Sequence, residues 1–164
     1  MQKELSSVAK IRFSDCDPIG HLNNVKYLEY MLNAREDHVE HGYGFTYEEY
    51  TRRTGCTWIT IQNEIAYLKE VRYNAKVIIT SKTIEISDRI SKVEILMMSE
   101  DGKTVHSILW LTVIYFDMKT RQSAVHPPET KELFTRFLMD LEEKDFQSRV
   151  GTFRRANKVA AKAG

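Results

Sequence analysis

The chain has 164 residues, of which 42% are hydrophobic and 29% charged, as expected for a globular protein with one hydrophobic core. Its 24 basic and 23 acidic residues give a net charge of +1, which argues against a nucleic-acid-binding protein or a protein drawn to acidic membranes. No apolar run is long enough to cross a bilayer, and residues 1–7 lack the apolar stretch of a secretory signal. Two cysteines without metal-like spacing favour a reducing compartment, so we expect a cytoplasmic protein.

The first half of the chain is expected to contain one strand and two helices. Residues 8–13 alternate between apolar and polar, which predicts a short strand, and turn and cap residues fill 14–24. Apolar positions at helical spacing predict a long helix over 24–41, and 45–54 has the pattern of a second, short helix. Four strands are then expected, at 58–69, 76–86, 92–99 and 103–116.

The end of the chain is expected to cover part of the sheet. Pro127 and Pro128 open a predicted helix whose apolar stripe runs to Leu141. We expect residues 1–147 to form a single domain, and 148–164, with five basic and no acidic residues, to be a flexible tail. The strand at 103–116 is apolar on both faces, so both faces of the sheet must be covered. The order of elements predicts an α+β fold, a mostly antiparallel sheet with the long helix on one face and a second subunit over part of the other.

The segment between the first strand and the long helix contains the residues best suited to chemistry. Asp15, Asp17, Gly20, His21 and the amides Asn23 and Asn24 all lie there. The start of a helix has unpaired N–H groups and partial positive charge, so it can stabilise an oxyanion and keep a nearby carboxylate ionised. Short polar residues before a helix are also ordinary turn and cap residues, and composition alone leaves both interpretations open.

This segment resembles the opening of a known family. Residues 12–24, followed by Tyr27-Leu28-Glu29-Tyr30 and Ala34-Arg35, are similar to the 4-hydroxybenzoyl-CoA thioesterase-like family of hot-dog proteins, and the likeness covers about residues 8–140. The resemblance implies a hot-dog fold, an antiparallel five- or six-stranded sheet wrapped around a long central helix. It implies a homodimer or homotetramer with active sites at the subunit interface. It also implies that Asp17 is the catalytic carboxylate and that backbone N–H groups around His21 to Asn24 form the oxyanion hole.

The expected function is hydrolysis of an acyl-CoA thioester, or of an acyl carrier protein thioester, without metal or cofactor. The leaving thiolate departs readily, because a model thiol has a pKa near 8.5. One carboxylate therefore suffices, either by attacking the thioester or by activating water. Two alternatives stay open: a hydratase or dehydratase of acyl thioesters, and a non-catalytic acyl-binding protein.

Other residues have both a functional and a structural interpretation. His21 donates to the thioester oxygen or orients Asp17, or it makes a structural hydrogen bond. Asn23 and Asn24 act at the site or cap the helix. The sequence also places Cys16 beside Asp17 without a base, so its thiol is expected to be inert.

The candidate substrate-binding residues are Gly20, Tyr27, Glu64, Arg89 and Lys92. Tyr27 lies in an apolar stripe with Leu28, Met31 and Leu32, which lines an acyl tunnel or packs in the core. Glu64 reaches a neighbouring subunit's site or is solvated, and Arg89 and Lys92 bind coenzyme A phosphates or belong to an ordinary turn. The pair His38 and His41 has no third ligand in the sequence and is expected to be solvated.

Overall fold

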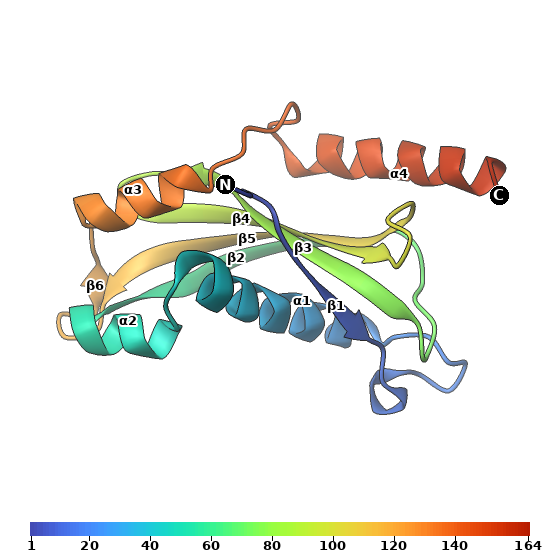
Figure 1. Cartoon of the computed structure of the whole chain (residues 1–164), viewed down its shortest axis with the longest axis horizontal. Coiled ribbons are helices and arrows are strands. Elements are labelled where there is room, and N and C mark those ends of the chain that lie inside the picture. Colours follow the sequence, from blue (N-terminus) through green and yellow to red (C-terminus); the bar gives the residue numbers. More distant parts are fainter.

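The computed structural model describes residues 1–164 and shows an antiparallel sheet with helices on both of its faces (Figure 1). The strands are β1 (Leu5–Lys10), β2 (Cys56–Tyr67), β3 (Lys76–Ile86), β4 (Ile90–Ser99), β5 (Val105–Asp117) and β6 (Gln122–Ser123). The α-helices are α1 (Asn24–His38), α2 (Tyr47–Thr54), α3 (Pro128–Arg136) and α4 (Phe146–Lys162). A 3-10 turn at Phe13–Asp15 precedes α1, and a π-helical turn at Val39–Tyr43 continues it. None of the helices combines the length and the hydrophobicity that a membrane crossing requires.

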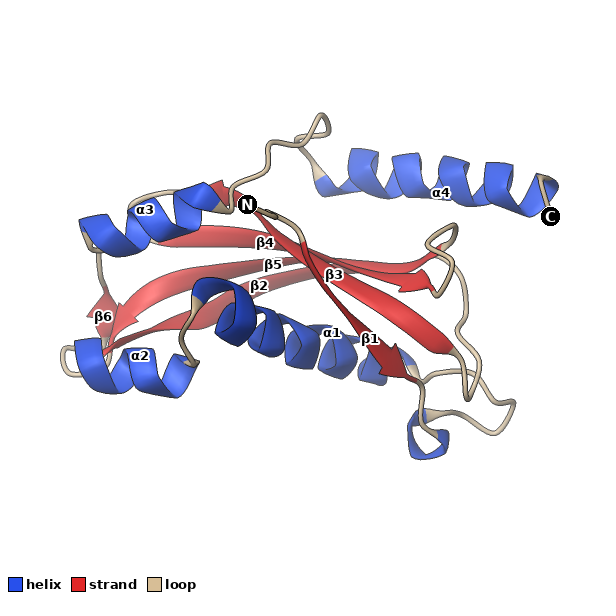
Figure 2. Cartoon of the chain, viewed as in Figure 1, coloured by secondary structure: helices blue, strands red, loops and turns tan.

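The strand order confirms the predicted antiparallel sheet. The order is β1-β3-β4-β5-β2, every pair is antiparallel, and β6 pairs with the end of β5 (Figure 2). β5 lies between β4 and β2 and is buried along most of its length on both faces, as its sequence predicted. β1 and β2 are left as the two edges of the sheet.

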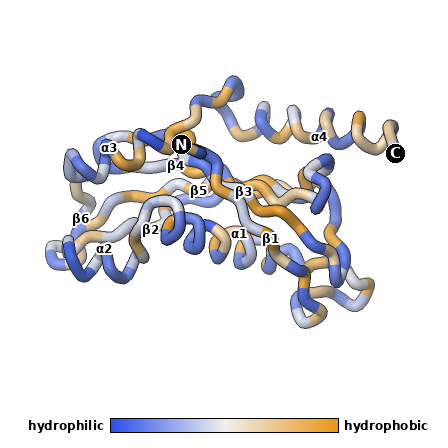
Figure 3. Tube along the Cα trace, viewed as in Figure 1, coloured by the Kyte–Doolittle hydropathy of each residue, from blue (hydrophilic) through white to orange (hydrophobic).

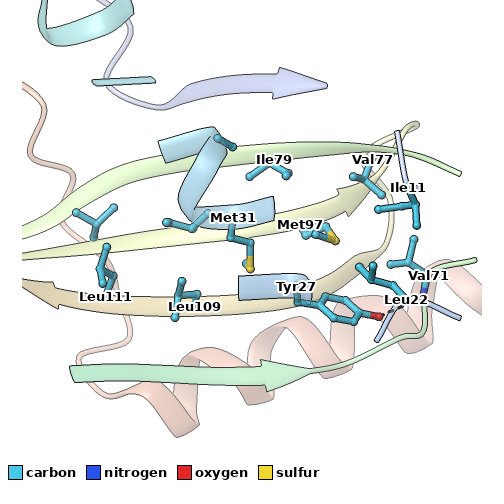
Figure 4. Packing of buried hydrophobic residues seen from close by; sticks show 13 residues of the cluster. Ile11, Leu22, Tyr27, Met31, Val71, Val77, Ile79, Met97, Leu109 and Leu111 are labelled. Carbon is cyan, nitrogen blue, oxygen red and sulfur yellow. Dashed lines mark hydrogen bonds between the residues drawn. The ribbon is translucent and has the colours of Figure 1, made fainter. Parts of the chain in front are cut away.

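The long helix α1 packs on one face of this sheet. Because neighbouring residues of a strand point to opposite faces, every second residue of β3, β4 and β5 faces α1. Figure 3 shows hydrophobic residues along much of β3 and hydrophilic stretches on the outer helices α2 and α3. Met31 of α1 is 0% exposed, and its side chain lies among the other labelled core residues (Figure 4). The core on this face consists of Ile11, Leu22, Tyr27, Met31, Ala34, Val71, Val77, Ile79, Val93, Ile95, Met97, Leu109 and Leu111.

The opposite face is covered by α4, where the sequence predicted a flexible tail from 148 onward. Asp145 caps this helix by accepting a hydrogen bond from the Ser148 N–H at 2.9 Å. Phe146 and Val150 are buried against a second apolar cluster that includes Trp110. The expected tail is therefore an ordered helix, and the expected boundary at 147 falls inside it.

The predicted C-terminal helix is shorter than expected. α3 ends at Arg136 rather than running to Leu141. The chain leaves the helix because Leu138 forms an isolated β-bridge with Thr83, and the Met139 N–H donates to the Thr83 carbonyl at 2.9 Å.

Candidate active site

Asp17 lies in a tight loop just before α1. Its backbone N–H donates to the His21 carbonyl at 2.8 Å, and its Oδ1 accepts from the N–H groups of Ile19 at 3.0 Å and His21 at 2.9 Å. Gly20 closes the loop with a φ of +82°, which a residue with a side chain rarely adopts. Oδ2 of Asp17 has no hydrogen-bond partner within the chain. One carboxylate oxygen is thus fixed by hydrogen bonds and the other has none.

The loop is held by the segment that precedes β3. The Leu22 N–H donates to the Val71 carbonyl at 2.8 Å, and the Tyr73 N–H donates to the Gly20 carbonyl at 2.8 Å. The Tyr27 hydroxyl accepts from the Val71 N–H at 3.2 Å. The loop therefore has a fixed position relative to both the sheet and α1.

The start of α1 has two free backbone donors. Asn23 is the N-cap, with φ −60° and ψ 138°, but its side chain makes no capping hydrogen bond. The backbone N–H groups of Asn24 and Val25 have no partner within the chain, whereas that of Lys26 donates to the Asn23 carbonyl at 2.9 Å. Two adjacent free N–H groups at a helix start are the donors that an oxyanion hole requires.

These free donors lie slightly later in the chain than the expected His21 to Asn24. The His21 N–H is bonded to Asp17, the Leu22 N–H to Val71, and the Asn23 N–H donates to the Asp15 carbonyl at 3.0 Å. Of the expected group, only the Asn24 N–H is unpaired.

Asp15 is bonded to α1 rather than left free in the loop. Its Oδ2 accepts from the Tyr30 hydroxyl at 2.7 Å, and its Oδ1 lies 3.8 Å from Lys26 Nζ. Burial, together with the hydrogen bond to Asp15, raises the pKa of Tyr30. Asp15 thereby fastens the loop to the second turn of α1.

Cys16 and His21 lie on either side of Asp17 in the loop. Burial and the carboxylates of Asp17 and Asp15 raise the pKa of Cys16, so its thiol stays protonated and unreactive. The His21 imidazole makes no hydrogen bond within the chain, and its expected role stays a prediction.

Tyr27 packs in the core instead of lining an open tunnel. It is 2% exposed, and its ring meets that of Tyr67 edge-on with centroids 5.1 Å apart. The Tyr67 hydroxyl donates to the Asn24 carbonyl at 3.0 Å. Both tyrosines therefore stabilise the start of α1 through packing and hydrogen bonds.

Glu64 does not join Asp17 within one chain. It lies on β2 opposite Trp110 of β5, and Trp110 belongs to the cluster under α4. Directly paired residues of antiparallel strands point to the same face. Glu64 is therefore on the face away from α1, half-buried and without an ion pair.

Arg89 and Lys92 lie at the other end of the sheet from Asp17. Arg89, in the turn after β3, donates to the Ser123 carbonyl at 2.7 Å, and Lys92 pairs with Glu85 at 3.3 Å. The Asp17 loop is hydrogen-bonded to the segment before β3, and Arg89 follows the end of β3. The length of β3, about 35 Å, therefore separates Asp17 from Arg89 (Figure 1). These basic residues stabilise the β3–β4 turn. They are too far from Asp17 to form one coenzyme A site with it in the same chain.

A cavity that the sequence did not predict lies farther along α1. It has a volume of about 240 Å³ and eleven lining residues, seven of them hydrophobic. Leu32, which belongs to the apolar stripe expected to line an acyl tunnel or to pack in the core, is among them, and Asp17 is not. Its lining comes from α1, α2, α3 and strands β2, β4 and β5, and includes Leu32, Arg35, Glu36, Trp58, Thr60 and Ser91.

Solved structures with the same fold include several thioesterases. A 1,4-dihydroxy-2-naphthoyl-CoA (DHNA-CoA) thioesterase from Staphylococcus aureus is 18% identical, with a TM-score of 0.72 over 81% of this chain and 89% of its own. A probable thioesterase from Escherichia coli is 20% identical, with a TM-score of 0.72 over 82% of this chain and 98% of its own. A Staphylococcus aureus protein solved in complex with CoA is 14% identical, with a TM-score of 0.77 over 90% of this chain and 92% of its own. The sheet curled around α1 is thus the hot-dog fold that the resemblance implied.

The sequence itself also matches a family. A search of curated proteins found no match. The profile of the Thioesterase-like superfamily matches residues 11–134, which include the Asp17 loop, α1 and strands β2 to β5. The chain therefore belongs to the Thioesterase-like superfamily.

Proposed function

We propose that this protein hydrolyses acyl-CoA thioesters to a free acid and CoA, with Asp17 as the nucleophile or general base. The observation that supports the proposal is that one oxygen of the Asp17 carboxylate is unpaired and that the start of α1, which follows in the chain, has free N–H groups. Oδ1 of Asp17 is held by two backbone N–H groups, Oδ2 is unpaired, and the N–H groups of Asn24 and Val25 are free. Acyl transfer requires a nucleophile or base together with hydrogen-bond donors that stabilise the oxyanion.

In the proposed reaction, the free amides bind the thioester oxygen as negative charge develops on it. Such a donor is typically worth about 10²- to 10³-fold in kcat. The Asp17 carboxylate either attacks the carbonyl carbon and expels the thiolate, or removes a proton from an attacking water. In the first route water then hydrolyses the mixed anhydride, and in both routes the thiolate leaves with the electron pair of the C–S bond.

The proposal also includes the carrier of the acyl group and the oligomeric state of the protein. We favour CoA over an acyl carrier protein, because one structure of the same fold was solved in complex with CoA. We also propose a homodimer or homotetramer with the site completed at a subunit interface, since the Asp17 loop and the cavity are separate within one chain. A cytoplasmic location and the absence of a cofactor stay predictions.

The test replaces Asp17 by asparagine, which retains an oxygen for the two backbone hydrogen bonds but has no negative charge. With a panel of acyl-CoAs, Asp17→Asn should lower kcat at least 100-fold and leave KM within a few-fold, as loss of a general base or nucleophile does. Free thiol release is the measurement. Asp101→Asn is the matched control, because Asp101 also accepts a backbone N–H through Oδ1 but lies in the exposed β4–β5 turn.

Equal rates for Asp17→Asn and the wild type would contradict the assignment. The same panel separates the alternatives. Hydration of an enoyl-CoA without thiol release would indicate a hydratase, and binding without any turnover would indicate an acyl-binding protein.

A further inference from the structure

The cavity along α1 is lined by two buried polar side chains, one without a hydrogen-bond partner and one without a counter-ion. Ser91 is 0% exposed and its hydroxyl has no hydrogen-bond partner. Arg35 is 4% exposed, and two of its nitrogens donate to Ser81 Oγ and to the Tyr43 hydroxyl, each at 3.1 Å. The guanidinium forms no ion pair with any carboxylate of the chain, so its charge has no counter-ion.

The surroundings of Arg35 do not neutralise its charge. The guanidinium lies 4.9 Å from the centre of the Tyr43 ring, and the partners are neutral hydroxyls. His38 next to it bonds Ser81 Oγ at 2.8 Å; burial and then Arg35 lower the pKa of His38 to about 4, so it is neutral. Glu36 also lines the cavity, but it is exposed and forms no ion pair. A buried cation without a counter-ion is unfavourable, and an anion from outside would relieve it.

The size and the lining of the cavity indicate what kind of molecule can carry this anionic group. An apolar cavity of about 150 Å³ accommodates benzene, so about 240 Å³ accommodates a substituted ring or a short chain. It is smaller than the usual 300–1,000 Å³ of pockets for larger ligands, so it has no room for the whole of CoA. Trp58 and Phe134 provide apolar walls around the polar groups. The occupant therefore combines a small apolar body with an anionic end.

The cavity lies along α1, away from the start of the helix. Leu28 and Leu32 are half-buried and one helical turn apart, and Leu32 lines the cavity. From Asn24 to Arg35 the helix rises by about 16 Å at about 1.5 Å per residue. A short acyl group does not span that distance within one chain, so the proposed subunit interface would bring the thioester to the cavity.

We propose that the cavity binds the acyl group of a thioester substrate that ends in a carboxylate, with Arg35 pairing with that carboxylate and Ser91 donating a hydrogen bond to it. This inference rests on the proposed function, because it names the class of acyl group that the enzyme hydrolyses. A neutral acyl chain of the same length leaves Arg35 and Ser91 unpaired and binds more weakly.

The kinetic test uses matched pairs that differ only at the far end of the chain: succinyl- and butyryl-CoA, adipoyl- and hexanoyl-CoA, suberoyl- and octanoyl-CoA. For at least one pair, the carboxylated thioester should have a kcat/KM about ten- to a hundredfold higher, the range of a hydrogen bond to a charged group. Arg35→Met, which keeps the length but not the charge, should remove or reverse this preference. Ser91→Ala should reduce it about three- to tenfold. Equal kcat/KM values within every pair would overturn the proposal.

Ser91→Ala keeps the test decisive even if Arg35→Met fails to fold. It removes a hydroxyl that bonds to nothing in the chain, so the melting temperature should not fall. Ser107→Ala is the matched control, because Ser107 is also 0% exposed but its hydroxyl donates to the Ala66 carbonyl at 2.9 Å. It should lower the melting temperature and leave the preference unchanged. A preference that survives Ser91→Ala and Arg35→Met alike would contradict the assigned roles.

A binding measurement separates this inference from the proposed reaction. Calorimetric titration of Asp17→Asn with adipoyl-CoA and hexanoyl-CoA needs no turnover and should show the same preference. Binding preference without hydrolysis by the wild type would support the cavity and reject the reaction. Hydrolysis without any binding preference would support the reaction and reject the cavity assignment.

Discussion

His38 is a residue whose protonation is strongly affected by the fold. It lies on α1, is 4% exposed, and its ring nitrogens are 2.8 Å from Ser81 Oγ and 3.0 Å from Ser7 Oγ. Burial, followed by the charge of Arg35, lowers its pKa from 6.5 to about 4. The expectation of a solvated pair of histidines is therefore wrong for His38, whereas His41 is exposed.

The lowered pKa of His38 predicts a loss of stability in mild acid. Between pH 6.5 and about 4 the unfolded chain protonates this histidine and the folded chain does not, so stability falls as the pH falls through that window. The full difference corresponds to at most about 3 kcal/mol in the free energy of unfolding. Urea unfolding at pH 7 and pH 4.5 should show a smaller loss for His38→Gln than for the wild type. His41→Gln is the control and should behave as the wild type does; an identical loss in His38→Gln would contradict the prediction.

At the scale of residues, the sequence predicts site residues that are close together in the chain, but not those that only the fold brings together. Asp17, Gly20 and His21 come together because they share one loop, whose strand-to-helix position is visible in the pattern. Arg35 and Ser91 belong to α1 and β4 and share a cavity only because the helix packs on that strand. No local spacing encodes such a contact.

At the scale of elements, α4 is attached to the sheet by a buried carboxylate. Glu94 of β4 is 1% exposed and accepts from Arg149 Nε at 2.8 Å, from Arg149 Nη2 at 2.7 Å and from Trp110 Nε1 at 2.9 Å. Lys82 Nζ lies 3.3 Å away. Burial alone raises the pKa of Glu94, but the hydrogen bonds from Arg149 and Trp110 outweigh it and hold the pKa below its ordinary value.

Removing Arg149 should therefore destabilise the whole fold. Arg149→Ala leaves Glu94 buried with only Lys82 and Trp110, and loss of one partner of a buried pair typically costs about 3–5 kcal/mol in the free energy of unfolding. Arg154→Ala, on the exposed side of the same helix, should change it by less than about 0.5 kcal/mol. Chemical unfolding measures both. Adding Glu94→Gln to Arg149→Ala should recover part of the loss, and an Arg149→Ala protein as stable as the wild type would contradict this account.

The elements themselves differ in how far the sequence predicts them. The strands are predicted within a few residues because apolar and polar positions alternate along them, and α1 because its apolar positions keep helical spacing. α4 is missed because its basic residues resemble a solvated tail, although Phe146, Val150 and Phe153 lie at helical spacing. The sequence does show that the second face of the sheet must be covered, but only the structure shows that these three residues cover it.

At the scale of the whole molecule, the free edge of β2 is the strongest sign of a partner. β2 has 12 residues and pairs only with β5, so its outer edge has unpaired backbone groups. Ile59 and Ile61 are 38% and 54% exposed, and the strand has no lysine, arginine or proline. Long edges without such protection pair readily with another strand. We expect two copies to join through β2 in an antiparallel, two-fold symmetric pair.

This pairing would bring the two halves of the proposed site together. Tyr67, at the C-terminal end of β2, bonds the Asn24 carbonyl at the start of α1. Trp58 and Thr60, near the N-terminal end, line the cavity. In an antiparallel pair each end of one strand lies beside the opposite end of the other. The helix start of one copy would then face the cavity mouth of its partner, which explains why Asp17 and the cavity are separate within one chain.

The substitution Ile61→Lys should therefore break the dimer and lower its activity. Ile61→Lys places two like charges near the two-fold axis, where the strands would meet, and a charge on an edge strand disfavours pairing. We expect the wild type to sediment as a dimer or as a tetramer made of two such dimers, and Ile61→Lys to sediment as a folded monomer with at least tenfold lower kcat/KM for acyl-CoA. Val8→Lys is the matched control, because Val8 is 66% exposed on β1, the other edge, and should change neither assembly nor activity. A fully active monomeric wild type would show that each chain completes its own site, and the path from Asp17 to the cavity would then have to run along α1, past Leu28 and Leu32.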